Sequence, residues 1–302
     1  MGLFSATLAA LFVALSNLFM RRSLDAGGTT RGFLVVQMSV AFLVAIVLGP
    51  IKTNSYTWNG PIVTLGLFSG LVLAAMLLVL GKALEKGPPG FTFSILSAAT
   101  VMPAIVMATL FGAAFGFYYT VWHGIGSLLV LAGLYWAGRG MDGMQNRRAW
   151  VILAITMFSL HALLLVIYQW RAIVMNYPSA LISSEQVRSQ WFMPTLYLGA
   201  AIVQMVIYLK NERRKLVLKE WLYGCGAGAC NSLCTFFLIQ ATEVATGFQS
   251  AVIFPFFSIG TIIFSNLWGQ HLYNEKVNWK ACQVCALGIL IGTVDWKSLL
   301  GF

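Results

Sequence analysis

The sequence predicts an all-α integral membrane protein with ten transmembrane helices, arranged as two inverted five-helix repeats. Three observations support this fold class: an excess of apolar residues, ten apolar stretches of spanning length, and a pattern shared by the two halves of the chain. Of the 302 residues, 59% are hydrophobic and 9% are charged. Because a soluble domain carries about 25% charged residues, this composition predicts that the lipid bilayer surrounds the chain.

The net charge of +10 does not indicate a nucleic-acid-binding protein. Such a protein gathers its basic residues on one face or stripe, whereas here they are spread over short connectors between apolar stretches. We therefore expect no nucleic-acid partner, and we assign the basic residues to membrane topology.

A helix needs about 20 predominantly apolar residues to cross the hydrocarbon core. By this criterion the predicted spans are 3–20, 33–50, 61–81, 91–112, 118–138, 149–170, 192–209, 221–241, 247–269 and 279–297. No basic segment precedes the first span, so we expect a retained helix and not a cleaved signal peptide. Tryptophans, Trp150 among them, fall near the span ends, as in an interfacial aromatic belt.

The basic residues divide unequally between the two sides of the predicted membrane. The connectors after spans 1, 3, 5, 7 and 9 hold fifteen lysines and arginines. The opposite side holds four: Lys52, Arg171, Arg188 and Lys297. Because cytoplasmic connectors are enriched in lysine and arginine, this division predicts a multi-pass protein of the plasma (inner) membrane with both termini outside.

The two halves of the chain, 1–140 and 141–302, share a pattern that predicts one repeat in each. At an offset of 157 residues, five identical pairs align without a gap: Gly90–Gly247, Phe91–Phe248, Ile105–Ile262, Leu110–Leu267 and Gly112–Gly269. A glutamate precedes the shared Gly-Phe pair in each half, Glu85 in one and Glu243 in the other. Since five spans per half is an odd number, the second repeat must be inverted relative to the first, as in many secondary transporters.

Two segments carry a family resemblance: "LGKALEKGPPGFTFSILSAATVMPAIV" in the first half and "LCTFFLIQATEVATGFQSAVIF" in the second. With them the chain resembles the ten-helix, EamA-like transporters of the drug/metabolite transporter superfamily. The resemblance implies a central cavity lined by helices 1, 3, 4, 6, 8 and 9, and a last helix in each repeat that can mediate dimers. Members commonly keep both termini in the cytoplasm, whereas the charge distribution here predicts the reverse. The small multidrug members also carry a carboxylate in the first helix, and "SATLAALFVALSNLF" has none.

His161 is the one ionisable residue near the middle of a predicted span, since all nine acidic residues lie in connectors or at span ends. Ionisable groups at this depth are costly and usually serve a function. Two readings stay open: a substrate-binding imidazole, or a neutral histidine that holds two helices together by a hydrogen bond.

Helix-breaking residues occur at matched positions of the two halves, because Pro103 and Gly260 are again 157 residues apart. Pro255 adds a second break to the same span as Gly260. Matched breaks point to the central site of a transporter, so these three residues are candidate hinges. The alternative is an ordinary packing kink, which membrane helices tolerate.

Polar residues at similar depth complete the candidate substrate-binding set: His161, Asn231, Thr100, Ser97 and Ser258. Gln37 and Gln204 are left out, because the resemblance places their spans at the periphery.

Glycines four residues apart permit close helix contact, and three such pairs occur: Gly66–Gly70, Gly224–Gly228 and Gly288–Gly292. Packing within the chain is the default role, and the last pair also hints at a homodimer. Cys282 and Cys285 have ligand-like spacing, but a single pair inside an apolar helix favours packing. We expect no bound metal and no cofactor.

These inferences favour a secondary transporter that moves a small polar organic metabolite, such as an amino acid or a nucleoside-like compound. The lack of a buried carboxylate favours facilitated diffusion or exchange by alternating access over proton coupling. No Walker-type nucleotide motif occurs, and we expect no enzymatic activity. Two alternatives stay open: a membrane enzyme acting on lipid or prenyl substrates, and a membrane scaffold that transports nothing.

Overall fold

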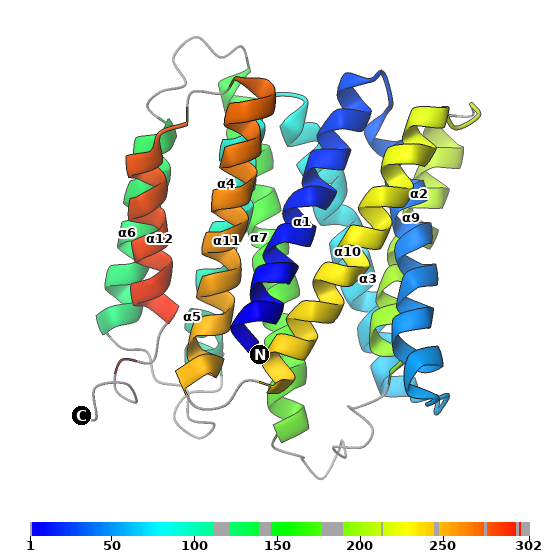
Figure 1. Cartoon of the computed structure of the whole chain (residues 1–302), viewed down its shortest axis with the longest axis horizontal. Coiled ribbons are helices and arrows are strands. Elements are labelled where there is room, and N and C mark those ends of the chain that lie inside the picture. Colours follow the sequence, from blue (N-terminus) through cyan, green and yellow to red (C-terminus); the bar gives the residue numbers. More distant parts are fainter. Residues whose placement is uncertain are drawn as a thin grey trace. The chain divides into compact units, whose positions relative to one another are not determined.

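The computed structural model describes residues 2–110, 121–138, 146–176, 190–212, 214–244, 248–274, 277–293 and 296. Within these ranges all regular secondary structure is helical. Figure 1 labels the α-helices α1 (Gly2–Asp25), α2 (Thr30–Ile46), α3 (Gly60–Leu84), α4 (Pro89–Ala98), α5 (Met102–Leu110), α6 (Val121–Gly138), α7 (Arg147–Asn176), α9 (Phe192–Asn211), α10 (Leu218–Val244), α11 (Phe248–Tyr273) and α12 (Trp279–Thr293). A π-helical turn, Val47–Ile51, extends α2, and a 3₁₀ turn, Ala99–Val101, joins α4 to α5.

A helix lies over each of the ten predicted spans, with the α4–α5 pair over 91–112. Six helical segments of the described chain are long and apolar enough to cross a membrane: Gly2–Asp25, Thr30–Ile51, Gly60–Leu84, Arg147–Tyr168, Phe192–Asn211 and Leu218–Ala241. The chain is therefore built as an α-helical, multi-pass membrane protein. The short turn expected near 113–121 lies almost wholly outside the described residues.

The chain forms two compact units that do not follow its two sequence halves. Unit 1 consists of Met1–Ala14, Lys86–Ala162 and Leu233–Phe302, and unit 2 of Leu15–Glu85 and Leu163–Ser232. Three boundaries between the units thus fall inside the helices α1, α7 and α10. The expected repeats, 1–140 and 141–302, are defined by similarity between the two halves of the sequence. A division of the chain into compact units does not test that similarity, so the repeats stay a prediction.

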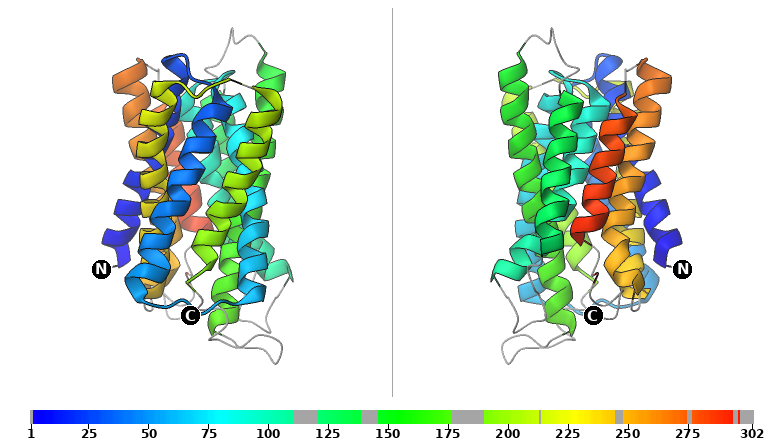
Figure 2. Two further views of the ribbon diagram at one scale, coloured as in Figure 1. Left: turned by 90° about the vertical axis from the view of Figure 1, so that its right-hand side faces the viewer. Right: turned by 90° about the vertical axis from the view of Figure 1, so that its left-hand side faces the viewer.

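Glycines pack the helices of both units, and all three predicted pairs make contacts within the chain. In unit 1, Gly126 of α6 lies against Gly288 and Gly292 of α12 so closely that an added Cβ would overlap their backbone. Figure 2 shows these two helices side by side. The homodimer expected from this glycine pair stays a prediction.

In unit 2 the other two glycine pairs serve in the same way. Gly66 and Gly70 of α3 face α9, and Gly224 and Gly228 of α10 face α2. Close backbone approach of this kind gains van der Waals contact, which drives helix association where the surrounding lipid is as apolar as the side chains.

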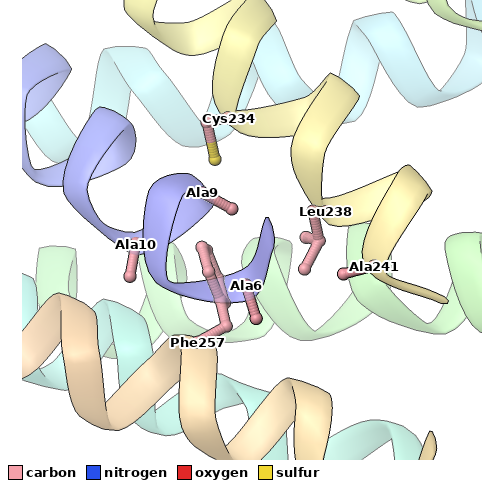
Figure 3. Packing of buried hydrophobic residues seen from close by; sticks show 7 residues of the cluster. All are labelled: Ala6, Ala9, Ala10, Cys234, Leu238, Ala241 and Phe257. Atoms are coloured by element: carbon pink, nitrogen blue, oxygen red, sulfur yellow. The ribbon is translucent and has the colours of Figure 1, made fainter. Parts of the chain in front are cut away.

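Small residues also form the apolar cluster that joins α1, α10 and α11 in unit 1. Phe257 of α11 reaches toward the alanines of α1, and Leu238 of α10 lies on the other side of them (Figure 3). The buried members are Ala6, Ala9, Ala10, Cys234, Leu238, Ala241 and Phe257.

A left-handed glycine ends α1 and leads directly into α2. Gly27 has φ +84°, which favours glycine because a Cβ would clash in this conformation. The Gly28 N–H bonds the Ser23 carbonyl at 2.9 Å and the Gly27 N–H bonds the Leu24 carbonyl at 3.0 Å, which is the Schellman arrangement. Thr29 is the N-cap residue of α2, and its hydroxyl accepts the Gly32 N–H at 3.1 Å.

A buried carboxylate ties the start of α2 to the start of α10. Glu220 has no exposed surface and accepts the N–H groups of Thr29 and Val217, each at 2.8 Å. Arg214 donates to both of its oxygens. The bond from Val217 is the return half of a capping box, three residues into the helix.

The Thr29 hydroxyl completes this cluster. It donates to Glu212 at 2.8 Å and accepts from Arg214 at 2.9 Å, in addition to the Gly32 N–H, so its hydrogen-bonding capacity is used in full. Glu212 also pairs directly with Arg214 at 3.0 Å. The hydrogen bond to Glu220 raises the pKa of Arg214 above its usual value, so Arg214 stays a cation at any physiological pH.

Replacing Glu220 by Gln should lower the free energy of unfolding by about 3 kcal/mol, because Arg214 then loses a buried anionic partner. The measurement is thermal unfolding of the purified protein in detergent. Asp25→Asn is the matched control: its half-exposed pair with Arg21, at 3.1 Å, should contribute less than about 1 kcal/mol. Equal effects of the two variants would contradict the structural role of Glu220.

Adding a side chain at the α6–α12 contact should also destabilise the protein. Gly126→Val forces the two helices apart and should cost about 2 kcal/mol. Gly60→Ala is the control, since no atom lies within 4 Å of a Cβ added there. The same unfolding measurement tests this, and a wild-type melting temperature for Gly126→Val would show that the contact is loose.

Candidate functional site

The helical segment α4–α5 is interrupted next to Pro103, as the sequence predicts. Pro103 has no N–H and therefore leaves the carbonyl of Ala99, four residues earlier, without its α-helical donor. The 3₁₀ turn Ala99–Val101 replaces this donor, because the Met102 N–H bonds the Ala99 carbonyl. The break thus keeps this backbone group satisfied, as a chain surrounded by lipid requires.

His161 of α7 contacts the last turn of α4 just before this break. Its Nδ1 lies 2.7 Å from the carbonyl oxygen of Leu96. A carbonyl oxygen only accepts hydrogen bonds, so Nδ1 carries the proton in this contact. In the neutral ring the other nitrogen, Nε2, is then an acceptor. The imidazole is half-buried.

Two hydroxyls extend the contact from α11 to the same break. Ser258 of α11 donates to the Thr100 oxygen at 2.8 Å, and Thr100 donates to the Ser97 carbonyl at 2.9 Å. Ser258 is fully buried and Thr100 is 3% exposed. The Ser97 carbonyl can only accept a hydrogen bond, so the Thr100 proton must point to it and the Ser258 proton must point to Thr100.

Unit 1 therefore brings together four of the five predicted binding residues. His161, Ser97, Thr100 and Ser258 all bond to the segment 96–100 or belong to it. Asn231 belongs to unit 2, where its carbonyl accepts from the Tyr197 hydroxyl at 3.1 Å. Its role in binding stays a prediction.

The three predicted hinges differ in what surrounds them. Pro103 follows the 3₁₀ turn directly, whereas α11 runs as one α-helix through Pro255 and Gly260. Gly260 packs closely, since a Cβ there would lie 3.0 Å from that of Ala10 on α1. The side chain of Pro255 lies outside the described residues. Hinge motion at either residue of α11 stays a prediction.

Two further polar contacts on α4 were missed by sequence reasoning. Trp150 of α7 was expected in the interfacial belt, but it is only 3% exposed and donates to the Thr92 hydroxyl at 3.2 Å. Asn266 of α11 donates to Ser94 at 3.2 Å. An asparagine within an apolar helix is the sequence signal that could have revealed the second contact.

In unit 2, the two glutamines left out of the candidate set are also buried. Gln37 donates to the Ser16 hydroxyl, and Gln204 donates to the Ala74 carbonyl, each at 2.9 Å. Within the described part of the chain, no group donates a hydrogen bond to either Oε1 atom. Gln37 thus joins α2 to α1, and Gln204 joins α9 to α3. Such a packing role is possible whether a span lies at the centre of the bundle or at its periphery.

The cysteines lie in packed surroundings. Cys282 accepts from Asn266 at 3.4 Å, and the Cys285 thiol lies 3.7 Å from the Val130 carbonyl. Within the described ranges, no group of three or more His, Cys, Asp or Glu side chains is placed to hold a metal ion. The side chains at the site can therefore donate, accept and position hydrogen bonds.

Comparison with known proteins supports the fold. No protein-family model matches the chain, and no curated protein shows significant sequence similarity to it. One crystal structure has 15% sequence identity and a TM-score of 0.60, with 94% of this chain and 96% of that chain covered. At this identity the likeness shows a common fold.

Replacing Thr100 by Val should destabilise the protein by about 2 kcal/mol, because the buried Ser258 hydroxyl loses its acceptor. Thr100→Ser keeps the hydroxyl and is the matched control, with the smaller loss of one methyl group. Thermal unfolding of both variants tests this. Equal stability of the two variants would show that the Ser258–Thr100 bond does not hold α11 to the break.

Proposed function

We propose that this protein is a secondary transporter that moves a small polar organic metabolite by alternating access. The proposal includes ten membrane spans in two inverted five-helix repeats, as in the EamA-like drug/metabolite transporters. It also includes a location in the plasma (inner) membrane, with both termini outside.

The observation that carries the proposal is the interrupted α4–α5 segment and its polar contacts. Broken helices in transporters mark the place where backbone and side-chain polar groups face a substrate. Here the break is contacted by a histidine from α7 and a serine from α11, in helices that are otherwise mostly apolar. A plain packing kink does not require polar side chains from two other helices.

Further support comes from the order of the helices. The helices lie over all ten spans expected from the sequence, and the Gly-Phe breaks recur 157 residues apart. The fold is shared with a solved structure over nearly the whole chain. These observations are compatible with two halves that rock about a central site.

The proposed mechanism needs no ATP and no proton relay. In the sequence all nine acidic residues lie in connectors or at the ends of predicted spans, so the proposal includes no carboxylate that carries a proton through the membrane. The substrate is proposed to displace water from the polar groups at the break, and the 3₁₀ turn gives the segment a point where it can bend. Transport then proceeds as facilitated diffusion or exchange.

Counterflow in proteoliposomes tests this function. Vesicles loaded with an unlabelled nucleoside or amino acid should accumulate the same labelled solute, and a pH gradient should not change the rate. The control is protein-free vesicles of the same lipid. Strict dependence on the pH gradient would contradict exchange, and no uptake of any solute in the panel would contradict the carrier function.

A further inference from the structure

We infer that His161 presents an unprotonated Nε2 to the transported solute and so binds a hydrogen-bond donor, a hydroxyl or N–H group. This inference rests on the proposed function and names the chemical class of its substrate. It follows from the position of the protons around the break of α4.

The Leu96 carbonyl sets the state of the imidazole. The contact of 2.7 Å between Nδ1 and this carbonyl oxygen requires the proton on Nδ1, because the oxygen has no proton to give. Nε2 of the neutral ring is then left with a lone pair on the opposite edge of the imidazole. His161 as a whole residue is partly exposed, and we place the solute at this edge.

The neighbouring hydroxyls have already used their protons. Thr100 donates its proton to the Ser97 carbonyl, and Ser258 donates its own to Thr100. Among the described site residues, Ser97 alone keeps a hydroxyl proton that no described group accepts. Nε2 of His161 is therefore the acceptor that we assign to the solute, beside one weak donor at Ser97.

This arrangement of donors and acceptors favours one of the two proposed substrate classes, nucleoside-like compounds, over the other, amino acids. An uncharged solute with hydroxyl and N–H groups, such as a nucleoside or a polyol, can donate to this acceptor. The carboxylate of an amino acid needs several donors or a cation, and the described site residues supply one hydroxyl. The site is thus suited to nucleoside-like or polyol-like solutes.

Two substitutions separate binding from structural support. In His161→Asn, the amide nitrogen can take the place of Nδ1 and bond Leu96, but nothing reaches the position of Nε2. In His161→Gln, the longer side chain can place an acceptor near that position and loses the bond to Leu96. We expect the melting temperature to be higher for the Asn variant, and uptake to be higher for the Gln variant.

The probe is labelled uridine in proteoliposomes of the full-length protein, with permethylated uridine as competitor. Permethylated uridine keeps acceptors and has no donor. Loss of one hydrogen bond to the substrate should lower uptake by the Asn variant roughly tenfold, and the permethylated compound should not compete. Three results would each overturn the inference. The first is uptake by the Asn variant at the wild-type rate, and the second is higher uptake by whichever variant has the higher melting temperature. The third is full competition by permethylated uridine.

A thermal-shift measurement keeps the two proposals distinguishable. If the wild-type protein takes up no solute, the carrier function fails, and stabilisation by uridine then tests the histidine alone. Stabilisation of the wild type and the Gln variant, but not of the Asn variant, supports the inference. Equal shifts in all three proteins, or no shift in any, would overturn it.

Discussion

Every backbone polar group of a helix in lipid needs a partner within the protein, and this requirement shapes the centre of unit 1. Pro103 removes one donor from the α4–α5 segment. The 3₁₀ turn supplies a replacement from Met102, and hydrogen bonds from α7 and α11 converge on the residues just before the proline. A break of this kind is stable where the freed backbone groups regain partners, and the contacts from α7 and α11 also gather the candidate site.

The two units use polar groups in different ways. Unit 2 concentrates its charge at helix ends, where Glu212 and Glu220 both pair with Arg214 around Thr29. Unit 1 has neutral hydroxyls and one imidazole around the break of α4. Charge is costly to bury unless paired, whereas neutral hydrogen-bonding groups can exchange partners with a solute at little cost. The break of unit 1 therefore has the neutral polar groups that the proposed binding site needs, whereas the cluster of unit 2 has the charge pairs of a permanent contact.

The sequence predicts features that depend on local pattern. Hydropathy located the helices, Pro103 located the break, and the glycine spacing indicated close helix contacts that the structure has. It could not predict which distant residues meet: Thr29 and Glu220 are 191 residues apart, and Trp150 and Thr92 are 58 apart. A tryptophan at a span end looks the same in sequence whether it faces the interface or packs inside, as Trp150 does. The directions of the protons at His161 and Thr100 likewise depend on carbonyls that only the folded chain brings near.

Accessibility of the break to water tests the central claim most directly. In a protein whose five cysteines are replaced, Ser97→Cys would be treated with a membrane-impermeant maleimide in intact vesicles, with Leu128→Cys on the exposed surface of α6 as the apolar control. We predict that the Ser97→Cys variant reacts, because a hydrated site supports the thiolate, and that the Leu128→Cys variant does not. If position 97 stays unreactive from both sides of the membrane, the break is a sealed packing kink and the proposed binding site does not exist.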